Sequence, residues 1–566
     1  MAKYDAFSRE ELIELLQKQD KELSLKKYGL AWDSEREPEK VVTDCAKKLP
    51  ILKSIQEKDI KTNDDDYNIM IEGDNYHALQ VLNYTHKEKI DMIYIDPPYN
   101  RGGDFVYNDR RIDKDDGYKH SLWLNFMEKR LSLAKELLSN TGVLIISIDD
   151  FEYANLKLLC NKIFGEDFVD TMIWRKSGEG RDGKMKNTTT FRKDHEYVIF
   201  CFKTNKLNKL CEKPEFVNQY NNPDKDPRGN YKAGSISRKE DASNPKHPNY
   251  YSVTSPSGKV FTRQFDMPKD EFEKLNNDTV QNSDGKLVSR IYWGKNGDAV
   301  PSIKIFTDEE RYITPFSLLL NKGTTTEGTK EVSSILAKDC SAMRPKPTSL
   351  IVPLIQLASK EDSIILDFFA GTGTTAHACL KANQKYLGKR KFIICTNNEG
   401  NIASEICYPR IKNVIKGYRK NGNEEFVEGL SGNIKYFKTD FVDNSKNSTQ
   451  TKVNLAKECA EMLCLKTGRF NELQCDNRSF KIFSNNANNQ YTCIYFDCFD
   501  TDMHDFVSEI KKLHGQKELY IFSLTDTVDS SLFESIADIK VEAIPYKILD
   551  LYKRIAKAHI KGIDND

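Results

Sequence analysis

A short apolar stretch, residues 90–95, ends abruptly in Asp96, Pro97, Pro98 and Tyr99. The Asp96 carboxylate and the Pro97 carbonyl accept hydrogen bonds while the prolines offer no N–H, so the tetrad is rich in acceptors. Such a site suits an amine, and the ring of Tyr99 adds a flat face for a heteroaromatic base. Two acceptors on an adenine amino group would stabilise the charge that develops as it attacks a methyl donor. A rigid turn without chemistry is the alternative interpretation.

A second cluster lies within residues 364–376, where an apolar run ends at Asp367 and leads into a glycine-rich turn and a helical pattern. Gly371 and Gly373 allow the backbone to approach a ligand closely. The pattern matches a dinucleotide fingerprint and is not a Walker A loop, because no Lys-Ser/Thr follows. The acid expected after the next strand is replaced by Thr-Asn-Asn, and only then comes Glu399. The residue that would bind a cofactor ribose therefore stays open.

Both clusters belong to a regular alternation of short apolar runs and helical patterns. The runs are residues 68–71, 90–95, 143–148, 364–368 and 391–395. Such alternation predicts a parallel sheet with crossover helices, in which ligands bind at the carboxyl ends of the strands. We therefore expect the two clusters to meet at one edge of the sheet.

Length and composition narrow the class of protein. At 566 residues the chain is expected to form three or four domains. It has no apolar run of the ~18 residues that a membrane span needs and no export signal at its start, so we expect a cytoplasmic protein without membrane contact. Thirteen cysteines, an odd number without a CxxC pair, fit reduced thiols and disfavour a zinc site. With 85 basic and 85 acidic residues, a nucleic-acid surface would have to be local.

In their order, the DPPY tetrad followed by the FAGTG turn, the two clusters resemble the beta group of S-adenosylmethionine-dependent amino methyltransferases of DNA. GDNYHAL, WLNFMEKRL, HEYVIF and MRPKPTSLI look like further segments of this family. KYGLAWDSE, TNNEGN and IPYKILDLYKRI resemble the modification (Mod) subunits of type III restriction-modification systems. Asp96, in place of the serine of cytosine-N(4) enzymes, implies that the target is adenine.

The resemblance implies an α/β fold, a doubly wound Rossmann-like methyltransferase sheet with an inserted target-recognition domain. That domain would occupy the region where the periodicity of the sequence dissolves and Gly, Asn, Pro and Tyr become frequent. The expected parts are an N-terminal helical arm (1–65), the catalytic half of the core (66–204), the target-recognition domain (205–340), the cofactor-binding half (341–438) and a C-terminal α/β domain (439–566).

The resemblance also implies roles for single residues, with S-adenosylmethionine as the cofactor and no metal. Catalysis would fall to Asp96, Pro97, Pro98 and Tyr99. Cofactor binding would fall to Asp74, Asn75, Asp367, Phe369, Ala370, Gly371, Thr372, Gly373, Thr374, Asn397 and Glu399.

A basic, glycine-containing loop at residues 174–193 is the clearest local candidate for gripping DNA phosphates. The residues expected to bind DNA are Arg175, Lys176, Arg181, Lys184, Lys186 and Lys193. A solvated loop without DNA contact is the alternative. The expected partners are double-stranded DNA, a second copy of the chain and a restriction (Res) subunit. The apolar face of the last helix, which carries Ile548 and Leu551, would serve either a dimer or its own domain.

We therefore expect a site-specific DNA methyltransferase that acts on the 6-amino group of a flipped adenine, as part of a restriction-modification system. A methyltransferase for RNA or for protein glutamine is a rival, although Asn more often begins its tetrad. A nicotinamide oxidoreductase would explain the glycine turn but not DPPY. A non-catalytic DNA-recognition subunit that lends specificity to a nuclease is the rival from another class, and the intact Asp96 and Tyr99 speak against it.

Overall fold

The computed structural model describes residues 39–560 together with Ile13 and Leu16. Gaps fall at 103–105, 108–109, 112–117, 178–190, 205–210, 213–219, 308–310, 313–314, 421–424, 445–447, 476, 486, 488 and 498–500. Two compact units result, one formed by residues 1–208 with 316–566 and the other by residues 209–315. The N-terminal arm lies outside the described residues as far as residue 38.

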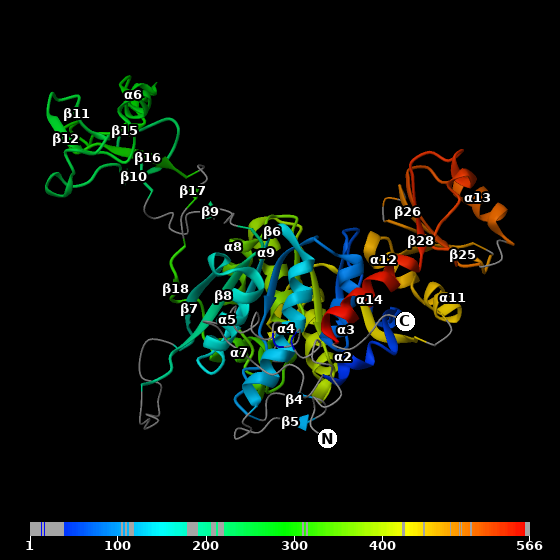
Figure 1. Ribbon diagram of the computed structural model, residues 1–566. Helices are drawn as coiled ribbons and strands as arrows, with labels where there is room; N and C mark the ends of the chain where they lie inside the picture. Colours follow the sequence, from blue (N-terminus) through cyan, green and yellow to red (C-terminus); the bar gives the residue numbers. More distant parts are fainter. Residues whose placement is uncertain are drawn as a thin grey trace. The chain divides into compact units, whose positions relative to one another are not determined.

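A ten-stranded mixed sheet forms the centre of the first unit (Figure 1). Its strands in spatial order are β1 (Lys48–Ser54), β23 (Asn433–Asp443), β2 (Tyr67–Glu72), β20 (Lys391–Thr396), β19 (Ile364–Asp367), β3 (Ile90–Ile95), β6 (Leu138–Ile148), β8 (His195–Phe202), β7 (Val169–Arg175) and β18 (Leu318–Leu319). The five strands from β2 to β6 pair in parallel, and β8 pairs antiparallel with β6 and β7. The predicted parallel sheet is confirmed, and all five predicted runs lie in it.

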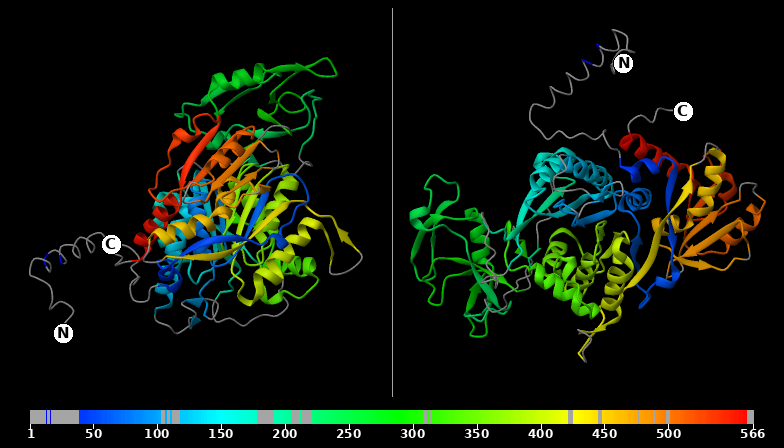
Figure 2. Two further views of the ribbon diagram at one scale, coloured as in Figure 1. Left: turned by 90° about the vertical axis from the view of Figure 1, so that its right-hand side faces the viewer. Right: turned by 90° about the horizontal axis from the view of Figure 1, so that it is seen from below.

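Helices cover both faces of this sheet (Figure 2). One face packs against α3 (Asn75–Thr85), α4 (Lys119–Leu137) and α5 (Tyr153–Phe164), and the other against α8 (Thr348–Ala358), α9 (Thr374–Tyr386) and α10 (Tyr408–Lys416). In β3, Ile93 and Ile95 point into the first layer while Met92 and Tyr94 point into the second. Because successive strand residues face opposite ways, a fully apolar strand is one buried on both sides. The doubly wound α/β fold is therefore confirmed.

Strand β1 belongs to the sheet, although the sequence interpretation placed residues 48–54 in the N-terminal arm. It pairs antiparallel with β23 along its whole length, from Lys48 opposite Asp443 to Ser54 opposite Phe437. Leu49, Ile51 and Leu52 are buried there. The sheet also continues past residue 438 through β23. Both differences arise because the edge of the sheet is completed by a pairing between segments about 390 residues apart, which no local pattern encodes. The short helix α2 (Lys40–Asp44) precedes β1.

The C-terminal part of the first unit contains a five-stranded sheet. Its strands are β24 (Asn471–Leu473), β25 (Phe480–Ser484), β26 (Gln490–Tyr495), β27 (Gln516–Phe522) and β28 (Ile539–Ile544). Its helices are α11 (Ser448–Glu458), α12 (Ala460–Thr467), α13 (Met503–Lys511) and α14 (Tyr546–His559). The apolar face of α14 is buried within the chain, where Tyr552 donates a hydrogen bond to the Pro50 carbonyl at 2.7 Å. That face therefore serves its own fold and is not an open dimer surface.

The second unit is built from short strands around a small aromatic core. A three-stranded sheet combines β10 (Tyr231–Ser235), β16 (Ser302–Phe306) and β15 (Ile291–Tyr292); two hairpins pair β11 (Tyr250–Thr254) with β12 (Val260–Gln264) and β13 (Thr279–Gln281) with β14 (Leu287–Ser289). Helix α6 (Lys269–Asn277) contributes Phe272, which packs on Phe265 and Trp293. The unit is shorter than the expected 205–340, because β18 and α7 (Thr325–Leu336) belong to the first unit.

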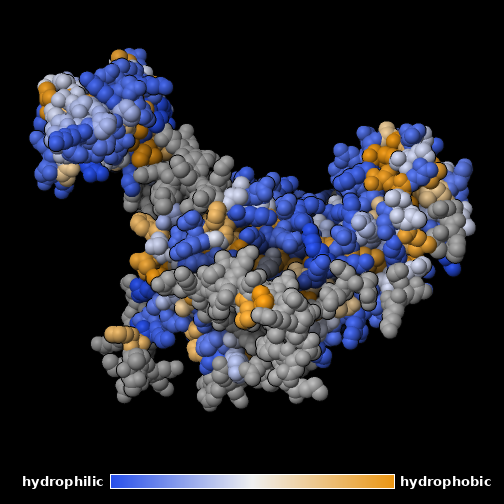
Figure 3. Space-filling view, viewed as in Figure 1, coloured by the Kyte–Doolittle hydropathy of each residue, from blue (hydrophilic) through white to orange (hydrophobic). Residues whose placement is uncertain are grey.

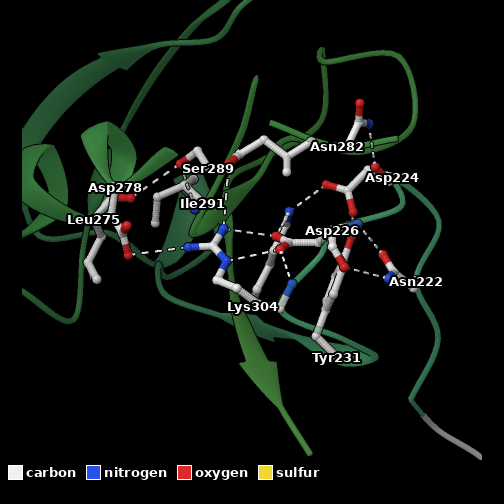
Figure 4. A network of polar contacts seen from close by, with 12 residues as sticks. Asn222, Asp224, Asp226, Tyr231, Leu275, Asp278, Asn282, Ser289, Ile291 and Lys304 are labelled. Atoms are coloured by element: carbon white, nitrogen blue, oxygen red, sulfur yellow. Dashed lines mark hydrogen bonds and ion pairs between the residues drawn. The ribbon is translucent and has the colours of Figure 1, made fainter. Parts of the chain in front are cut away.

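A cluster of buried charges lies beside that aromatic core (Figure 4). The Lys304 ammonium is fully buried and lies 2.8 Å from Asp226 and 2.5 Å from Asp224. Arg228 also pairs with Asp226 at 2.8 Å. These cations hold the pKa of Asp226 at about 2 against the effect of its burial. The charges therefore compensate one another inside the unit.

Four short strand pairs complete the description. They are β4 (Val106–Tyr107) with β5 (Arg110–Arg111), β9 (Cys211–Glu212) with β17 (Arg311–Tyr312), and β21 (Tyr418–Arg419) with β22 (Phe426–Val427), besides β18 on β7. Hydrophilic side chains dominate the face of the molecule seen in Figure 3. Among the helices that the structure describes, none combines the length and the apolar character that crossing a membrane would require.

Candidate active site

Both sequence clusters lie at the carboxyl edge of the central sheet, on neighbouring strands. The tetrad follows β3 and the glycine turn follows β19, and these strands pair in parallel with Ile365 opposite Met92. The carboxyl ends of neighbouring parallel strands face the same side. The expected meeting of the two clusters at one edge of the sheet is therefore confirmed.

The tetrad is held in place from its backbone. The buried indole of Trp123 on α4 donates to the Pro98 carbonyl at 2.8 Å. Asn100 ends the turn in a left-handed conformation with φ of 57°, and its amide donates to buried Glu152 at 2.6 Å and to the Lys119 carbonyl at 3.2 Å. A polar side chain that tolerates this conformation suits the position. The turn is thereby fixed at both of its ends.

The side chain of Asp96 meets a lysine from a distant part of the chain. The Lys346 ammonium lies 2.8 Å and 2.7 Å from the two carboxylate oxygens of Asp96 and 2.8 Å from the Tyr99 hydroxyl. The same hydroxyl lies 2.8 Å from Asp96 and 3.2 Å from Glu196. Lys176 approaches Glu196 from its other side at 3.3 Å. The site is a compact group of two carboxylates, two ammonium groups and a phenol.

The electrostatics of this group follow from burial and pairing. Burial raises the pKa of Asp96 above its usual range, and Lys346 works against that rise. For Glu196, Lys346 and Lys176 outweigh burial and lower the pKa. Burial lowers the pKa of Lys346, but the two carboxylates more than offset it and raise the value overall. The lysine is thus held as an ammonium ion at neutral pH.

Sequence reasoning did not single out Lys346 or Glu196 as site residues. Both stand in segments that the family resemblance used, MRPKPTSLI and HEYVIF, and each is a charge within an otherwise apolar or proline-rich stretch. A charged side chain in a buried segment needs an oppositely charged or hydrogen-bonding partner. That signal marks the two residues as candidates, but only the fold shows that they meet Asp96 across 250 and 100 residues of chain.

The glycine turn after β19 is braced by Asp367. Its carboxylate accepts hydrogen bonds from the Phe369 N–H at 2.9 Å and from the Thr375 hydroxyl, and burial raises its pKa to about 7. The Ala370 N–H bonds to the Cys395 carbonyl at 3.0 Å. Asp367 is therefore a support of the turn.

The two glycines of the turn face different surroundings. Gly371 has φ of 49°, and a Cβ there would find only the Phe369 carbonyl at 3.8 Å. Gly373 has φ of 79°, but a Cβ there would come within 3.0 Å of Cys407 and 3.2 Å of Ile411 in the core. The space for a ligand thus lies on the side of Gly371, whereas Gly373 serves packing.

Thr372 and Thr374 of the turn are buried and bound from behind by Arg410. One guanidinium nitrogen lies 3.2 Å from the Thr372 carbonyl, 3.1 Å from the Thr372 hydroxyl and 2.8 Å from the Thr374 hydroxyl. The other terminal nitrogen of Arg410 lies 3.4 Å from Glu331 on α7. Sequence reasoning had assigned both threonines to the cofactor; the structure shows them holding the turn.

The turn between β2 and α3 forms the second half of the candidate cofactor site. Asp74 caps α3 by accepting the Tyr76 N–H at 2.7 Å. Asn75 donates to the Phe368 carbonyl at 3.1 Å and accepts from the guanidinium of Arg130 at 2.6 Å. Arg130 is itself paired through two nitrogens with Glu39, at 2.7 Å and 3.0 Å. Arg130 and Glu39 were missed by sequence reasoning.

The residues after β20 lie between these two turns in the order of the sheet. Asn397 and Glu399 are exposed, and Glu399 opens a short 3-10 turn, Glu399–Asn401, that leads into a π-helical segment, Ile402–Cys407. Segments of this kind occur often at functional sites. Carboxylates at Asp74 and Glu399 and the open side of Gly371 fit a ligand such as S-adenosylmethionine, which carries hydroxyl donors and needs close backbone approach.

The residues expected to bind DNA differ in how exposed they are, and three of them lie outside the described part of the chain. Arg175 ends β7, and Lys193 is 65% exposed and lies 3.3 Å from Asp150. Lys176 is only 19% exposed, and its ammonium points to Glu196. Arg181, Lys184 and Lys186 lie outside the described residues. Lys176 therefore belongs to the group of charged side chains around Asp96 and Glu196.

Comparisons with known proteins find relatives of similar sequence. The StyLTI Mod subunit of Salmonella typhimurium, a type III restriction-modification enzyme, is 31% identical over 412 residues, which cover 66% of this chain and 60% of that protein. The type II methyltransferase M.KpnI of Klebsiella pneumoniae is 31% identical over 374 residues, 62% of this chain and 83% of that protein. The type III EcoPI Mod subunit of Escherichia phage P1 is 29% identical over 455 residues, 70% of this chain and 68% of that protein.

A solved structure of M1.HpyAVI with SAM aligns at 13% identity and a TM-score of 0.30, over 61% of this chain and 98% of that one, which is too low to support an argument. The family model described as DNA methylase matches residues 90–393, which run from the start of β3 into β20 and include both clusters. The chain therefore belongs to the DNA methylase family.

Proposed function

We propose that this protein transfers a methyl group from S-adenosylmethionine to the 6-amino group of adenine in double-stranded DNA, as the modification enzyme of a restriction-modification system. The observation that carries the proposal is that Asp96 and Gly371 follow two strands, β3 and β19, that pair in parallel, so that an amine-accepting turn and an open glycine turn stand at the same edge of the sheet. Mod subunits among the relatives support the assignment to restriction-modification.

The chain's own residues would act on the target amine. The Asp96 carboxylate and the Pro97 carbonyl accept its two hydrogens, and Asp96 is placed to take the proton that the amine releases. The face of Tyr99 supports the base by stacking once the base has been flipped out of the duplex. The bound cofactor supplies an electrophilic methyl group. The acceptors thus stabilise charge that develops only during transfer.

The cofactor would rest on the two turns that flank β20. Asp74 and Glu399 offer carboxylates, Asn75 and Phe369 follow β2 and β19, the two strands that pair with β20, and Gly371 leaves room for the ligand. Asp367 and Gly373 would not contact the cofactor but would maintain the conformation of the turn.

The direct test is transfer of tritiated methyl groups to genomic DNA from a methylation-deficient bacterium, followed by separation of the nucleosides. We expect label in N6-methyl-2'-deoxyadenosine and none in N4-methyl-2'-deoxycytidine. Asp96→Ala should lower the rate by ~100-fold or more while calorimetry shows nearly unchanged cofactor affinity. Transfer that survives within a few-fold removes Asp96 from catalysis, and a wild type that binds DNA without transferring label favours the non-catalytic alternative.

Assembly and DNA reading belong to the same proposal. We propose that the second unit, residues 209–315, reads the sequence, that the loop at 174–193 contacts phosphates, and that the protein works in the cytoplasm as a homodimer able to dock a Res subunit. The near neutrality of the whole chain means that phosphate contact must come from such local basic segments. Light scattering tests the dimer, since a mass near 65 kDa that does not change with DNA contradicts it.

A further inference from the structure

The ammonium group of Lys346 occupies the place at which the proposed function puts the target amine. It lies within 2.8 Å of both Asp96 oxygens and of the Tyr99 hydroxyl, and 5.0 Å from the centre of the Tyr99 ring. An ammonium and an amino group offer the same N–H donors to an acceptor. A base amine and Lys346 therefore compete for the Asp96 carboxylate.

We propose that Lys346 is a placeholder for the target amine: it pairs with Asp96 in the DNA-free enzyme and moves to Glu196 when the base enters. The inference rests on the proposed function and deepens it, because it names a positioning residue for the same site. Lys346 touches neither the methyl donor nor the reacting nitrogen in this scheme.

Glu196 is placed to receive the displaced ammonium. It is buried, and one of its oxygens already lies 3.4 Å from Lys346, while the other is paired with Lys176 at 3.3 Å. The Tyr99 hydroxyl bridges Asp96 and Glu196 at 2.8 Å and 3.2 Å. A buried charge that loses its partner is strongly destabilising. A second carboxylate within reach lets Lys346 leave Asp96 without becoming unpaired.

Lys346 also keeps Asp96 ionised, so that its carboxylate can accept hydrogen bonds from the target amine. Among the residues that the structure describes, the titratable groups that act on Asp96 are Lys346, Glu196, Tyr99, Tyr94 and Asp367, and of these five Lys346 alone carries a positive charge. Lys176 lies beyond Glu196. Burial and the neighbouring carboxylate raise the pKa of Asp96, and Lys346 opposes both. Without the lysine, Asp96 would take up a proton at higher pH and would lose acceptor capacity.

The test uses the full chain with Lys346→Met, in single-turnover transfer of tritiated methyl groups to unmethylated genomic DNA from pH 5.5 to pH 9. We expect the acid limb of the rate profile to move upward by about one to three pH units, the usual effect of an adjacent opposite charge. The rate is then low near neutrality and recovers at pH 9. Calorimetry should show unchanged affinity for S-adenosylmethionine. Lys346→Gln, which keeps N–H donors but no charge, should give the same displacement.

Lys466→Met is the matched control. Lys466 is also a mostly buried lysine paired with a carboxylate, Glu542 at 3.0 Å, but it lies in the C-terminal part of the unit. Its removal should leave the acid limb where the wild type has it. An acid limb that stays in place in both Lys346 variants, or that moves equally in the control, overturns the placeholder.

A double-mutant cycle tests the transfer of Lys346 to Glu196. Glu196→Gln leaves the ammonium on Asp96 and should slow transfer roughly tenfold or more at every pH. In the double variant, Lys346→Met with Glu196→Gln, no ammonium needs a second partner, so its rate at pH 9 should match that of Lys346→Met alone. If the losses in transfer rate of the two single variants instead add up in the double variant, the movement of Lys346 to Glu196 is contradicted. Absence of transfer by the wild-type protein would instead contradict the proposed function.

Discussion

The indole N–H of Trp123, in the N-terminal part of α4, donates a hydrogen bond over 2.8 Å to the carbonyl oxygen of Pro98 in the turn that carries Asp96. Trp123 is fully buried, so its position is set by the core. Proline fixes the backbone angle before the carbonyl, and the hydrogen bond fixes the carbonyl itself. The direction of the neighbouring Pro97 carbonyl is thereby determined from the core of the protein.

Replacing Trp123 by Phe tests this support. The change keeps an aromatic ring but removes the donor, so the turn gains freedom near the amine site. We expect the single-turnover rate of methyl transfer at saturating DNA to fall roughly tenfold, in line with loss of a hydrogen bond to a buried acceptor. The affinity for S-adenosylmethionine should stay within about twofold, because the cofactor turns are unaffected. Rapid-quench transfer and calorimetry measure the two quantities.

Trp174→Phe provides the comparison. Trp174 is equally buried, and its indole N–H bonds to the Gly323 carbonyl at 3.3 Å, away from the tetrad. Its replacement should lower the free energy of unfolding without a comparable loss of rate. Similar rate losses in both variants would show that the effect of Trp123 is one of general stability.

The glycine turn allows a matched pair of substitutions. Gly371→Ala and Gly373→Ala both place a side chain at positive φ, which costs each about 1–2 kcal/mol. Only the second also meets Cys407 and Ile411. We expect Gly373→Ala to give the larger fall in urea midpoint, and Gly371→Ala to give the larger loss of cofactor affinity in calorimetry, because its Cβ projects into open space. The reverse order would place the ligand on the other side of the turn.

Much of the fold could be predicted because its strands are buried on both faces. A run such as residues 90–95 is apolar except for Asp91, and its end is marked by Asp96 and two prolines, so both the strand and its functional end are visible in one segment. The cofactor turn was visible for the same reason. Strand β1 was not, since three of its seven residues are exposed or only partly buried and its partner lies near residue 440.

The missed site residues share a different cause. Lys346, Glu196 and Arg130 act through partners that lie 55 to 250 residues away, and no spacing rule connects such pairs. A single buried charge can be noticed in sequence, but its partner is chosen by the fold. For Gly373 the structure adds what the sequence does not show, namely that a side chain there would meet Cys407 and Ile411.

The pKa of Asp367 predicts how the first unit responds to pH. Burial raises that pKa from 3.8 to about 7 in the folded protein. As the pH rises, Asp367 therefore loses its proton in the unfolded state before it does so in the folded state. Its contribution to the free energy of unfolding is complete below about pH 4 and is lost by about pH 7. Asp367→Asn cannot ionise and should remove this slope. Hydrogen exchange of peptides from β19 and α9, measured from pH 4 to pH 7 without cofactor, follows the effect. An identical pH dependence in the two proteins would contradict the raised pKa.

Asp226 should respond in the opposite direction, within the second unit. Its pKa is lowered from 3.8 to about 2, because Arg228 and Lys304 outweigh its burial. The unfolded state takes up a proton first as pH falls, so the stabilisation is full above about pH 4 and is lost as the pH approaches 2. At ~1.4 kcal/mol per unit, it amounts to roughly 2 kcal/mol.

Asp226→Asn in the full chain should abolish that acid-dependent loss and should also destabilise the second unit at pH 7, because Lys304 is then buried with one charged partner fewer. Hydrogen exchange of peptides within residues 220–307 reports on this unit alone. Asp284→Asn is the control, since Asp284 pairs with Lys225 at an exposed site where an ion pair contributes little. Equal losses of protection in the two variants at pH 7 would show that the buried cluster does not hold the unit together.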